Sequence, residues 1–333
     1  MAPCVGAINL YPIKSCRGVS VQSAMLTEAG LMFDREWMVV REDTGKFISQ
    51  REKGLLALVE VALPPEALAA AHSGASKLPS GAAMTVTAPG MEPLHVPLVR
   101  RPDAKIRKVT VWEWTGAGAD EGADAAAWFS RYLGVPCRLV RYLGSAAAAA
   151  AAAASTGDDG DGGASLPTVR TTEPEFAVDY ETRFSDGYPM LLVTQAALAD
   201  LNSKLSEPLP MNRFRPNLEV AGTDPWAEDG WRDVDVVCSA DGRTLRLTSV
   251  KPCSRCKVTT INQATAEVGD EPLDTLGTIR SGKVLGWNKN RKDWTHSVFF
   301  GWNVVSRTPG VLSVGDALTV ASPQCHDALV PAP

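Results

Sequence analysis

The chain has 333 residues, of which 45% are hydrophobic and 21% charged, and it carries a formal net charge of −5. This composition is typical of a soluble globular protein with one large core or two domains of ordinary size, and the acidic balance excludes a large nucleic-acid footprint. No apolar run is as long as a membrane helix, no signal peptide is recognisable, and the scattered cysteines form no paired framework. The sequence therefore predicts a cytoplasmic protein.

Short strands joined by turns dominate the first 143 residues. We expect strands at residues 5–10, 36–41, 46–50, 56–63, 84–88, 94–99, 105–114 and 137–143. The tripeptide Asp43-Thr44-Gly45 is a hairpin signal between two of these runs. The first expected helix covers residues 120–133, because acidic residues open it, apolar residues recur along it and Gly134 follows it.

A low-complexity segment at residues 144–168 interrupts this pattern. It contains nine consecutive alanines, Ala146 to Ala154, and then an acidic, glycine-rich run. Such a composition cannot bury a hydrophobic core. We therefore expect an insertion between a domain at residues 1–143 and a domain at residues 169–325, and we assign no function to it.

The second half of the chain is again mostly strand. A helix is expected from a Thr194 cap to Leu205, with leucines on its inner face. Strands are expected at residues 190–193, 234–238, 243–250, 297–305, 312–316 and 317–320. The tripeptide Ala240-Asp241-Gly242 predicts a hairpin between the second and third of them. Because hairpin-connected strands far outnumber helices, the sequence predicts a mostly β fold of the α+β class with a barrel-like architecture.

Two cysteines in a C-x-x-C spacing form the most reactive stretch of the chain. Cys253 and Cys256 follow an apolar strand, and the basic neighbours Lys251, Arg255 and Lys257 favour the thiolate form. Three interpretations remain open beside an inert buried cysteine pair. They are a dithiol redox pair, a zinc site that lacks its other ligands, and one thiolate binding a metal whose remaining ligands belong to a cofactor. The β-branched residues 258–261 predict another strand.

Several cations lie near turn signals. Arg215 is the most informative of them, because Phe214 and Pro216 flank it at the start of an apolar strand, where a lone cation is costly. Guanidinium groups, and a hydroxyl beside a lysine, suit phosphate oxygens. A phosphate-bearing cofactor would unite the thiols with four motifs that contain a cation: Lys14-Ser15 with Arg17, Asp34-Arg35-Glu36, Arg213 with Arg215, and Lys251 with Arg255.

Taken together and in order, five short motifs resemble the MOSC-domain proteins of the amidoxime-reducing component family. They lie at residues 11–16, 34–35, 184–189, 214–217 and 253–260. The resemblance implies an N-terminal MOSC-associated β-barrel domain, a MOSC β-barrel domain and a molybdenum–molybdopterin cofactor between them. In such proteins one cysteine holds the metal. That cysteine corresponds to Cys256, and Cys253 has no ligand role.

The resemblance also assigns further residues to the site. Cys256, Asp186 and Arg280 are predicted to be catalytic. The cofactor-binding residues are predicted to be Lys14, Ser15, Arg35, Arg213, Arg215, Ser254, Arg255 and Cys256. This chain departs from the family pattern at Gly187 and Tyr188, where small hydroxyl residues are usual, at Arg213, which replaces an amide residue, and at Asn303, where a related member has tyrosine.

The function implied by the resemblance is the reduction of N-hydroxylated compounds, namely amidoximes and hydroxylamines, and of nitrite to nitric oxide. The chain has no haem or flavin motif of its own, so electrons must arrive from outside. The resemblance implies that cytochrome b5 and NADH-cytochrome b5 reductase supply them. The alternative is a molybdenum-cofactor carrier or a sulfurase-like protein that handles the cofactor. Mitochondrial association is the alternative to a cytoplasmic location.

Overall fold

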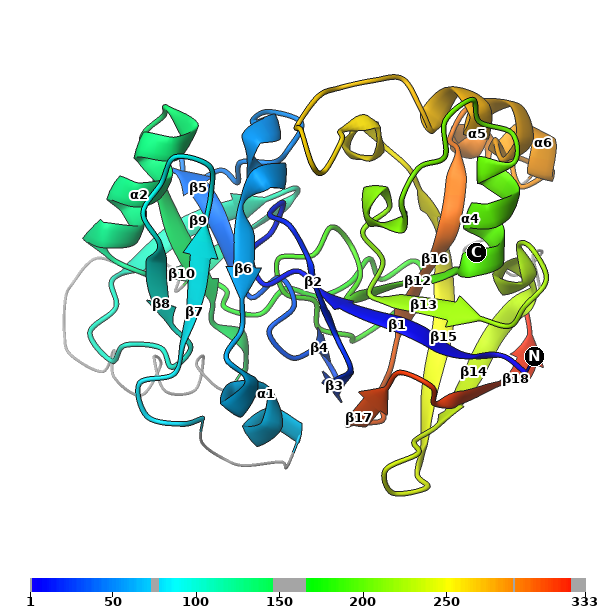
Figure 1. Ribbon diagram of the computed structural model, residues 1–333, viewed down its shortest axis with the longest axis horizontal. Coiled ribbons are helices and arrows are strands. Elements are labelled where there is room, and N and C mark those ends of the chain that lie inside the picture. Colours follow the sequence, from blue (N-terminus) through cyan, green and yellow to red (C-terminus); the bar gives the residue numbers. More distant parts are fainter. Residues whose placement is uncertain (1, 73–77, 146–165, 290, 325–333) are drawn as a thin grey trace.

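The computed structural model describes residues 2–72, 78–145, 166–289 and 291–324, and its two lobes are both built mainly from strands (Figure 1). The expectation of a mostly β fold is confirmed. The predicted insertion at residues 144–168 lies largely outside the described residues. No helix in the described ranges is both long and apolar enough to cross a membrane.

The C-terminal lobe is a closed barrel of seven strands. Its strands follow the order β13 (Leu218–Ala221), β12 (Met190–Thr194), β16 (Phe299–Val305), β15 (Thr244–Ser254), β14 (Trp231–Val237), β18 (Ala317–Pro323) and β1 (Cys4–Leu10), and β1 pairs again with β13. Strand β2 (Val19–Val21) adds to the side of β1. Closure leaves the seven strands without a free edge, so their backbone groups are paired all the way round.

The first strand of the chain belongs to this barrel. Val5 of β1 lies opposite Val220, and Ile8 lies opposite Leu218. The side chains of Val5 and Ile8 are buried, so the first strand is anchored in the core of the C-terminal lobe. The chain then crosses to the N-terminal lobe through residues 11–17. The domain boundary expected at residue 143 stays a prediction. Strand β1 comes before that boundary in the sequence but pairs within the barrel of the C-terminal lobe.

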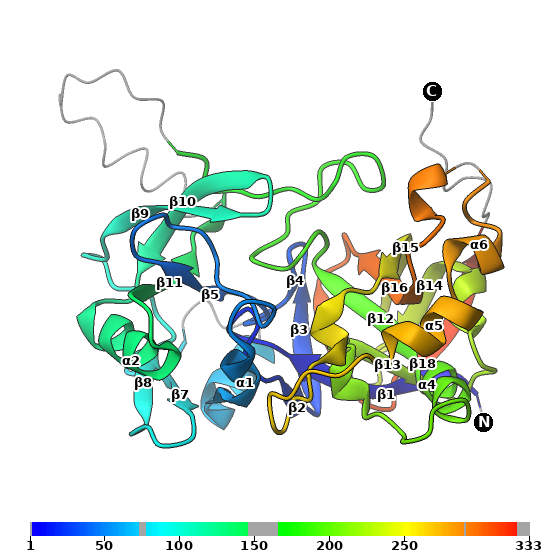
Figure 2. The ribbon, with the colours of Figure 1, turned by 90° about the horizontal axis from the view of Figure 1, so that it is seen from above.

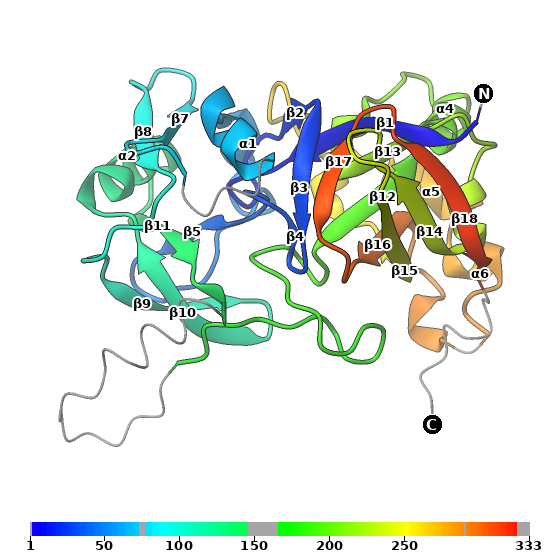
Figure 3. The ribbon, with the colours of Figure 1, turned by 90° about the horizontal axis from the view of Figure 1, so that it is seen from below.

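The N-terminal lobe contains two sheets and two helices. One sheet has the order β5 (Trp37–Arg41), β11 (Cys137–Tyr142), β10 (Trp114–Asp120), β9 (Ile106–Val111), and the other has β6 (Glu60–Ala62), β7 (Ala83–Thr87), β8 (Leu94–Pro97). Helices α1 (Pro65–His72) and α2 (Ala123–Leu133) complete the lobe. A small sheet of β17 (Gly310–Ser313), β3 (Ser23–Thr27) and β4 (Gly30–Leu31) lies between the lobes (Figure 3). One continuous hydrophobic core runs through both lobes.

The expected strand at 105–114 and helix at 120–133 need correction. The chain makes a hairpin there: β9 ends at Val111, β10 begins at Trp114, and α2 begins only at Ala123. Sequence propensity misses β10 because alanines and glycines are poor strand formers. A side chain at Gly116 would lie 2.1 Å from the Trp114 ring, so packing requires the glycine.

Two expectations in the C-terminal half, a helix cap and a hairpin, are confirmed. The Thr194 hydroxyl caps α4 (Gln195–Asn202) by accepting a hydrogen bond of 3.2 Å from the Ala197 N–H. Strands β14 and β15 form the expected hairpin. Short helices α5 (Leu273–Ile279) and α6 (Gly282–Leu285) follow. Residues 166–189, which lead into β12, pass from the N-terminal lobe to the C-terminal lobe (Figure 2).

Candidate functional site

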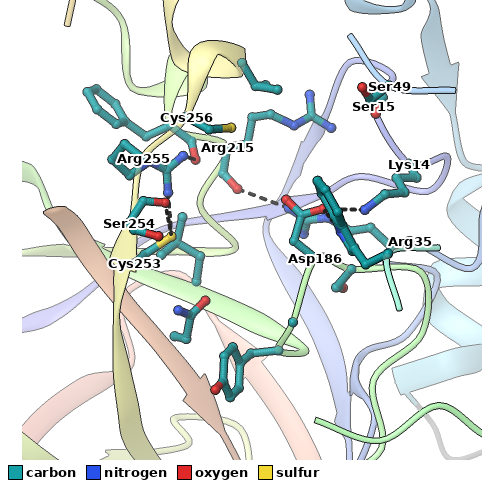
Figure 4. Close-up of a pocket in the computed structure, with 18 of the residues that line it drawn as sticks. Lys14, Ser15, Arg35, Ser49, Asp186, Arg215, Cys253, Ser254, Arg255 and Cys256 are labelled. Atoms are coloured by element: carbon teal, nitrogen blue, oxygen red, sulfur yellow. Dashed lines mark hydrogen bonds and ion pairs between the residues drawn. The ribbon is translucent and has the colours of Figure 1, made fainter. Parts of the chain in front are cut away.

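A pocket lies between the two lobes, and both contribute to its wall (Figure 4). The space between its walls is about 880 Å³, a figure that includes the open mouth. The N-terminal side supplies Lys14, Ser15, Arg35, Ser49, Arg51 and Trp112, and the C-terminal side supplies Asp186, Arg215 and the run from Cys253 to Cys256. The structure therefore brings together most of the predicted site residues.

The two cysteines occupy different environments. Strand β15 continues to Ser254, and shifts of register beside Pro252 accommodate the proline. The expected strand at 258–261 is wrong, because residues Lys257–Thr260 form a 3₁₀ turn that begins directly after Cys256. Cys253 is half-buried and Cys256 is exposed to the pocket. Burial raises the pKa of the Cys253 thiol, although Arg255 opposes this shift.

Arg255 holds the cysteine turn in place and keeps one donor free. Its Nη1 donates to Cys253 Sγ at 2.8 Å, and its Nη2 donates to the Phe214 carbonyl at 2.8 Å. Its Nε is buried and has no hydrogen-bond partner among the described residues. A buried donor without an acceptor is costly, so this atom points to a ligand.

Two further arginines stack against one tyrosine. The guanidinium carbons of Arg35 and Arg215 each lie 4.3 Å from the centre of the Tyr11 ring. Burial raises the pKa of Tyr11 to about 12 and lowers the pKa of Arg215 to about 10. Arg35 is fixed by Asp34 at 2.7 Å and by Asn217 at 2.9 Å. The single side-chain bond of Arg215 is long, 3.4 Å to Gln263.

Backbone strain concentrates at this pocket. Of the eight non-glycine residues with positive φ in the described part of the chain, four line it: Ser15, Arg35, Trp112 and Arg215. Such conformations are unfavourable for residues with a Cβ and persist where the surrounding structure enforces them. At Ser15 the backbone carbonyl accepts a hydrogen bond of 2.7 Å from Gln50, which holds the turn.

Lys14 and Asp186 form an ion pair in the pocket wall. Lys14 Nζ lies 2.5 Å from Asp186 Oδ1, and the exposed fractions of the two side chains are 6% and 75%. Burial lowers the pKa of Lys14 to about 8, although Asp186 favours its charged form. Desolvation opposes ionisation of Asp186, but the Lys14 charge and a hydrogen bond from Trp112 hold the pKa of that carboxyl well below its usual range.

Two predicted site residues do not reach the pocket. Arg213 donates to the backbone carbonyls of Thr259 at 2.8 Å and Glu271 at 3.0 Å. Arg280 is buried in an ion pair with Asp229 at 2.7 Å. Neither is among the lining residues. Arg213 supports the 3₁₀ turn beside the cysteines. Arg280 supports the barrel at a place behind the pocket.

Other lining residues were missed from the sequence. Arg51 stacks on Trp112 at 4.6 Å, and nothing in the sequence distinguishes it from other surface arginines. Trp112 occupies the β9–β10 turn that sequence propensity had assigned to a strand. Tyr188 and Asn303, noted above as departures from the family pattern, also line the pocket.

The residues that the structure describes do not by themselves offer a complete metal site. No group of three or more histidine, cysteine, aspartate or glutamate side chains that could hold a metal occurs within the described ranges. This finding disfavours the zinc interpretation, which needs about four protein ligands. The dithiol pair and the single thiolate that shares a metal with a cofactor remain.

Comparisons with known proteins agree with this architecture. The MOSC N-terminal beta barrel domain matches residues 2–136, and the MOSC domain matches residues 179–319. Mitochondrial amidoxime reducing component 2 of Rattus norvegicus is 32% identical over 324 residues, which cover 94% of this chain and 81% of the relative. Mitochondrial amidoxime-reducing component 1 of Homo sapiens is 28% identical over 323 residues, with the same coverage.

Fold and pocket thus define a MOSC-domain protein with a two-lobed β architecture. The MOSC domain is related to molybdenum-cofactor sulfurases and links the chain to that cofactor. The chain belongs to the family of the amidoxime-reducing components, as its motifs predicted. That family is one of reductases associated with the molybdenum cofactor.

Proposed function

We propose that the pocket holds molybdenum–molybdopterin and that the protein reduces N-hydroxylated compounds such as amidoximes and hydroxylamines, and also nitrite. One observation carries this proposal: the exposed thiol of Cys256 shares a pocket with several cationic side chains, among them those of Lys14, Arg35, Arg215 and Arg255. A soft thiolate suits a soft metal. The cations suit the phosphate of the pterin.

The donor set fits such a cofactor. Cys256 would hold the metal, and Cys253 is already occupied by Arg255 at 2.8 Å. Ser15, Ser254 and the cations named above would hold the pterin and its phosphate. The partnerless Nε of Arg255 supports this assignment, because it is a buried donor that needs an acceptor. Arg213 and Arg280 are left out of the proposed set because their side chains are engaged elsewhere.

When bound, the cofactor supplies the electrons that break the N–O bond of the substrate. Reduction of an amidoxime consumes two electrons and two protons and gives an amidine and water. Reduction of nitrite to nitric oxide consumes one electron and two protons and also gives water. Lys14, whose pKa burial lowers to about 8, is suited to hold a transferable proton at the pocket wall, and the ionised carboxylate of Asp186 is suited to orient it.

The electron donors in this proposal are cytochrome b5 and NADH-cytochrome b5 reductase. The family resemblance supports this, and the related proteins cited above are named as components, which implies that they act with other proteins. Those relatives are also named mitochondrial, which supports mitochondrial association as the alternative to the cytoplasmic location expected from the sequence.

Metal and pterin analysis of the purified chain tests the proposal, followed by benzamidoxime reduction with cytochrome b5, its reductase and NADH. We expect about one molybdenum per chain and NADH oxidation that matches benzamidine formation. Bound cofactor that exchanges readily and gives no turnover would favour the carrier alternative. Absence of both molybdenum and pterin from protein made in a cofactor-producing host would contradict the proposal.

A further inference from the structure

Arg170 lies in the connecting segment, residues 137–178, that neither family domain matches. The arginine is 6% exposed. Its backbone N–H donates to the Tyr142 hydroxyl at 2.8 Å, which ties it to β11 of the N-terminal lobe. Its guanidinium reaches the irregular loop that precedes β12 and carries Asp186.

Three backbone carbonyls of that loop accept hydrogen bonds from the one guanidinium. Nη1 donates to Arg183 O at 3.0 Å and to Ser185 O at 2.6 Å, and Nη2 donates to Asp186 O. The loop has no strand partners for these carbonyls, so a planar group with several fixed donors sets their orientation. The carbonyl of Asp186 itself is one of the three.

The Asp186 side chain depends on this support. It is 75% exposed, and Lys14 at 2.5 Å and the Trp112 N–H at 3.2 Å are its hydrogen-bond partners. Both partners lie in the N-terminal lobe, whereas Asp186 precedes a barrel strand. The carboxylate reaches them only if its backbone is held toward that lobe, which is where Arg170 holds it.

No carboxylate lies within ion-pair distance of Arg170 in the part of the chain that the structure describes. Burial lowers the pKa of Arg170, so its charge is costly here. That charge also helps to lower the pKa of Lys14. A buried cation without an ion-pair partner, beside the Lys14–Asp186 pair, indicates that Arg170 supports the pocket.

We propose that Arg170 of the connecting segment is a positioning residue that holds Asp186 against Lys14 and Trp112. The proposal rests on the proposed role of Asp186 at the site. It extends the functional site into a segment that neither domain match covers. Arg170 acts through the loop backbone and does not line the pocket.

The Trp112 indole reports the position of Asp186 without any turnover. The NMR resonance of the indole N–H is assigned in the full-length chain by its loss in Trp112→Phe. The chemical shift of this resonance in Asp186→Asn then marks the loss of the carboxylate contact. We expect Arg170→Met to move the resonance most of the way to that position. Arg170→Lys keeps the charge and can reach a single carbonyl, so it should restore part of the wild-type shift.

Arg183 offers a matched control on the same loop. Its guanidinium also binds backbone carbonyls, those of Ala29 at 3.2 Å and Leu31 at 2.8 Å, but these lie away from the pocket. Arg183→Met should therefore leave the Trp112 resonance unchanged. In cofactor-loaded protein, Arg170→Met should lower the rate per bound molybdenum by roughly 10-fold, a fraction of what an acid–base group contributes.

A folded Arg170→Met protein with the wild-type Trp112 resonance would overturn the proposal, and so would an equal change in Arg183→Met. If Arg170→Met does not fold, Arg170→Gln decides by the same resonance, because glutamine lacks the charge but retains two donors. The resonance is measured without substrate or electron donor. Failure of the reductase proposal would therefore leave this result intact.

Discussion

Arg215→Met separates cofactor retention from stability. In the folded protein this arginine is 9% exposed, stacks on Tyr11 at 4.3 Å and makes one long hydrogen bond of 3.4 Å. The stacking contributes about 0.5–2 kcal/mol. Removing a buried cation, whose pKa burial lowers to about 10, offsets much of that loss. We therefore expect the free energy of unfolding without cofactor to change by about 1 kcal/mol or less.

Cofactor binding should respond much more strongly. A charge-assisted hydrogen bond to phosphate contributes about 1.5–3 kcal/mol, which corresponds to a roughly 10- to 150-fold change in affinity. The assay is the pterin and molybdenum content of folded protein after serial dialysis, together with thermal unfolding. The rate per bound molybdenum should change little, because Arg215 is assigned to the cofactor rather than to the reacting atoms.

Arg213 provides the control two residues away. Its side chain donates to two backbone carbonyls and does not line the pocket. Arg213→Met leaves two acceptors unsatisfied, at a cost of about 1–3 kcal/mol each. We expect lower stability, with cofactor retained in the molecules that fold. Full cofactor content in Arg215→Met, or cofactor loss in both variants at unchanged stability, would refute the reasoning.

Three further predictions concern the thiols, the buried lysine and the low-complexity segment. Cys256→Ala should abolish reduction even where pterin is retained, and Cys253→Ala should stay nearly as active as wild type; equal loss in both would revive the dithiol interpretation. The pKa of Lys14 in the fold is about 8, so the residue loses its proton above that pH and the rate per molybdenum should fall there. Lys14→Arg should shift this fall in rate to higher pH, and a pH profile that does not shift would argue against a role for Lys14. Deleting residues 146–163, which lie outside the described residues, should leave molybdenum content unchanged, and loss of the metal would show that the segment is structural.

Local sequence was sufficient for the features that short runs of residues determine. The Thr194 cap and the β14–β15 hairpin follow from capping and turn chemistry within a few positions. The pocket residues Lys14, Arg35 and Arg215 could be singled out because each lies beside residues where a lone cation is unexpected or beside a turn. Their grouping in one pocket followed from the family resemblance, since they are far apart in the chain.

Contacts between distant segments decided what the sequence missed. Residues 258–261 have β-branched side chains, yet Arg213 draws the Thr259 carbonyl into a 3₁₀ turn through a bond of 2.8 Å. Strand β10 contains Gly116, which the packing of the Trp114 ring requires. In both places tertiary contacts outweigh a propensity of about 1 kcal/mol or less.

The sequence by itself determined a mostly β chain, its family and most of the charged residues of the pocket. The tertiary structure decided that β1 closes the barrel of the other lobe, that Trp112 and Arg51 line the pocket, and that Arg280 lies behind it. These facts depend on side chains more than 50 positions apart in the sequence, such as Arg280 and Asp229 at 2.7 Å. Local propensity acts over a few residues, so only the closure of the barrel and the packing of the lobes could bring such groups together.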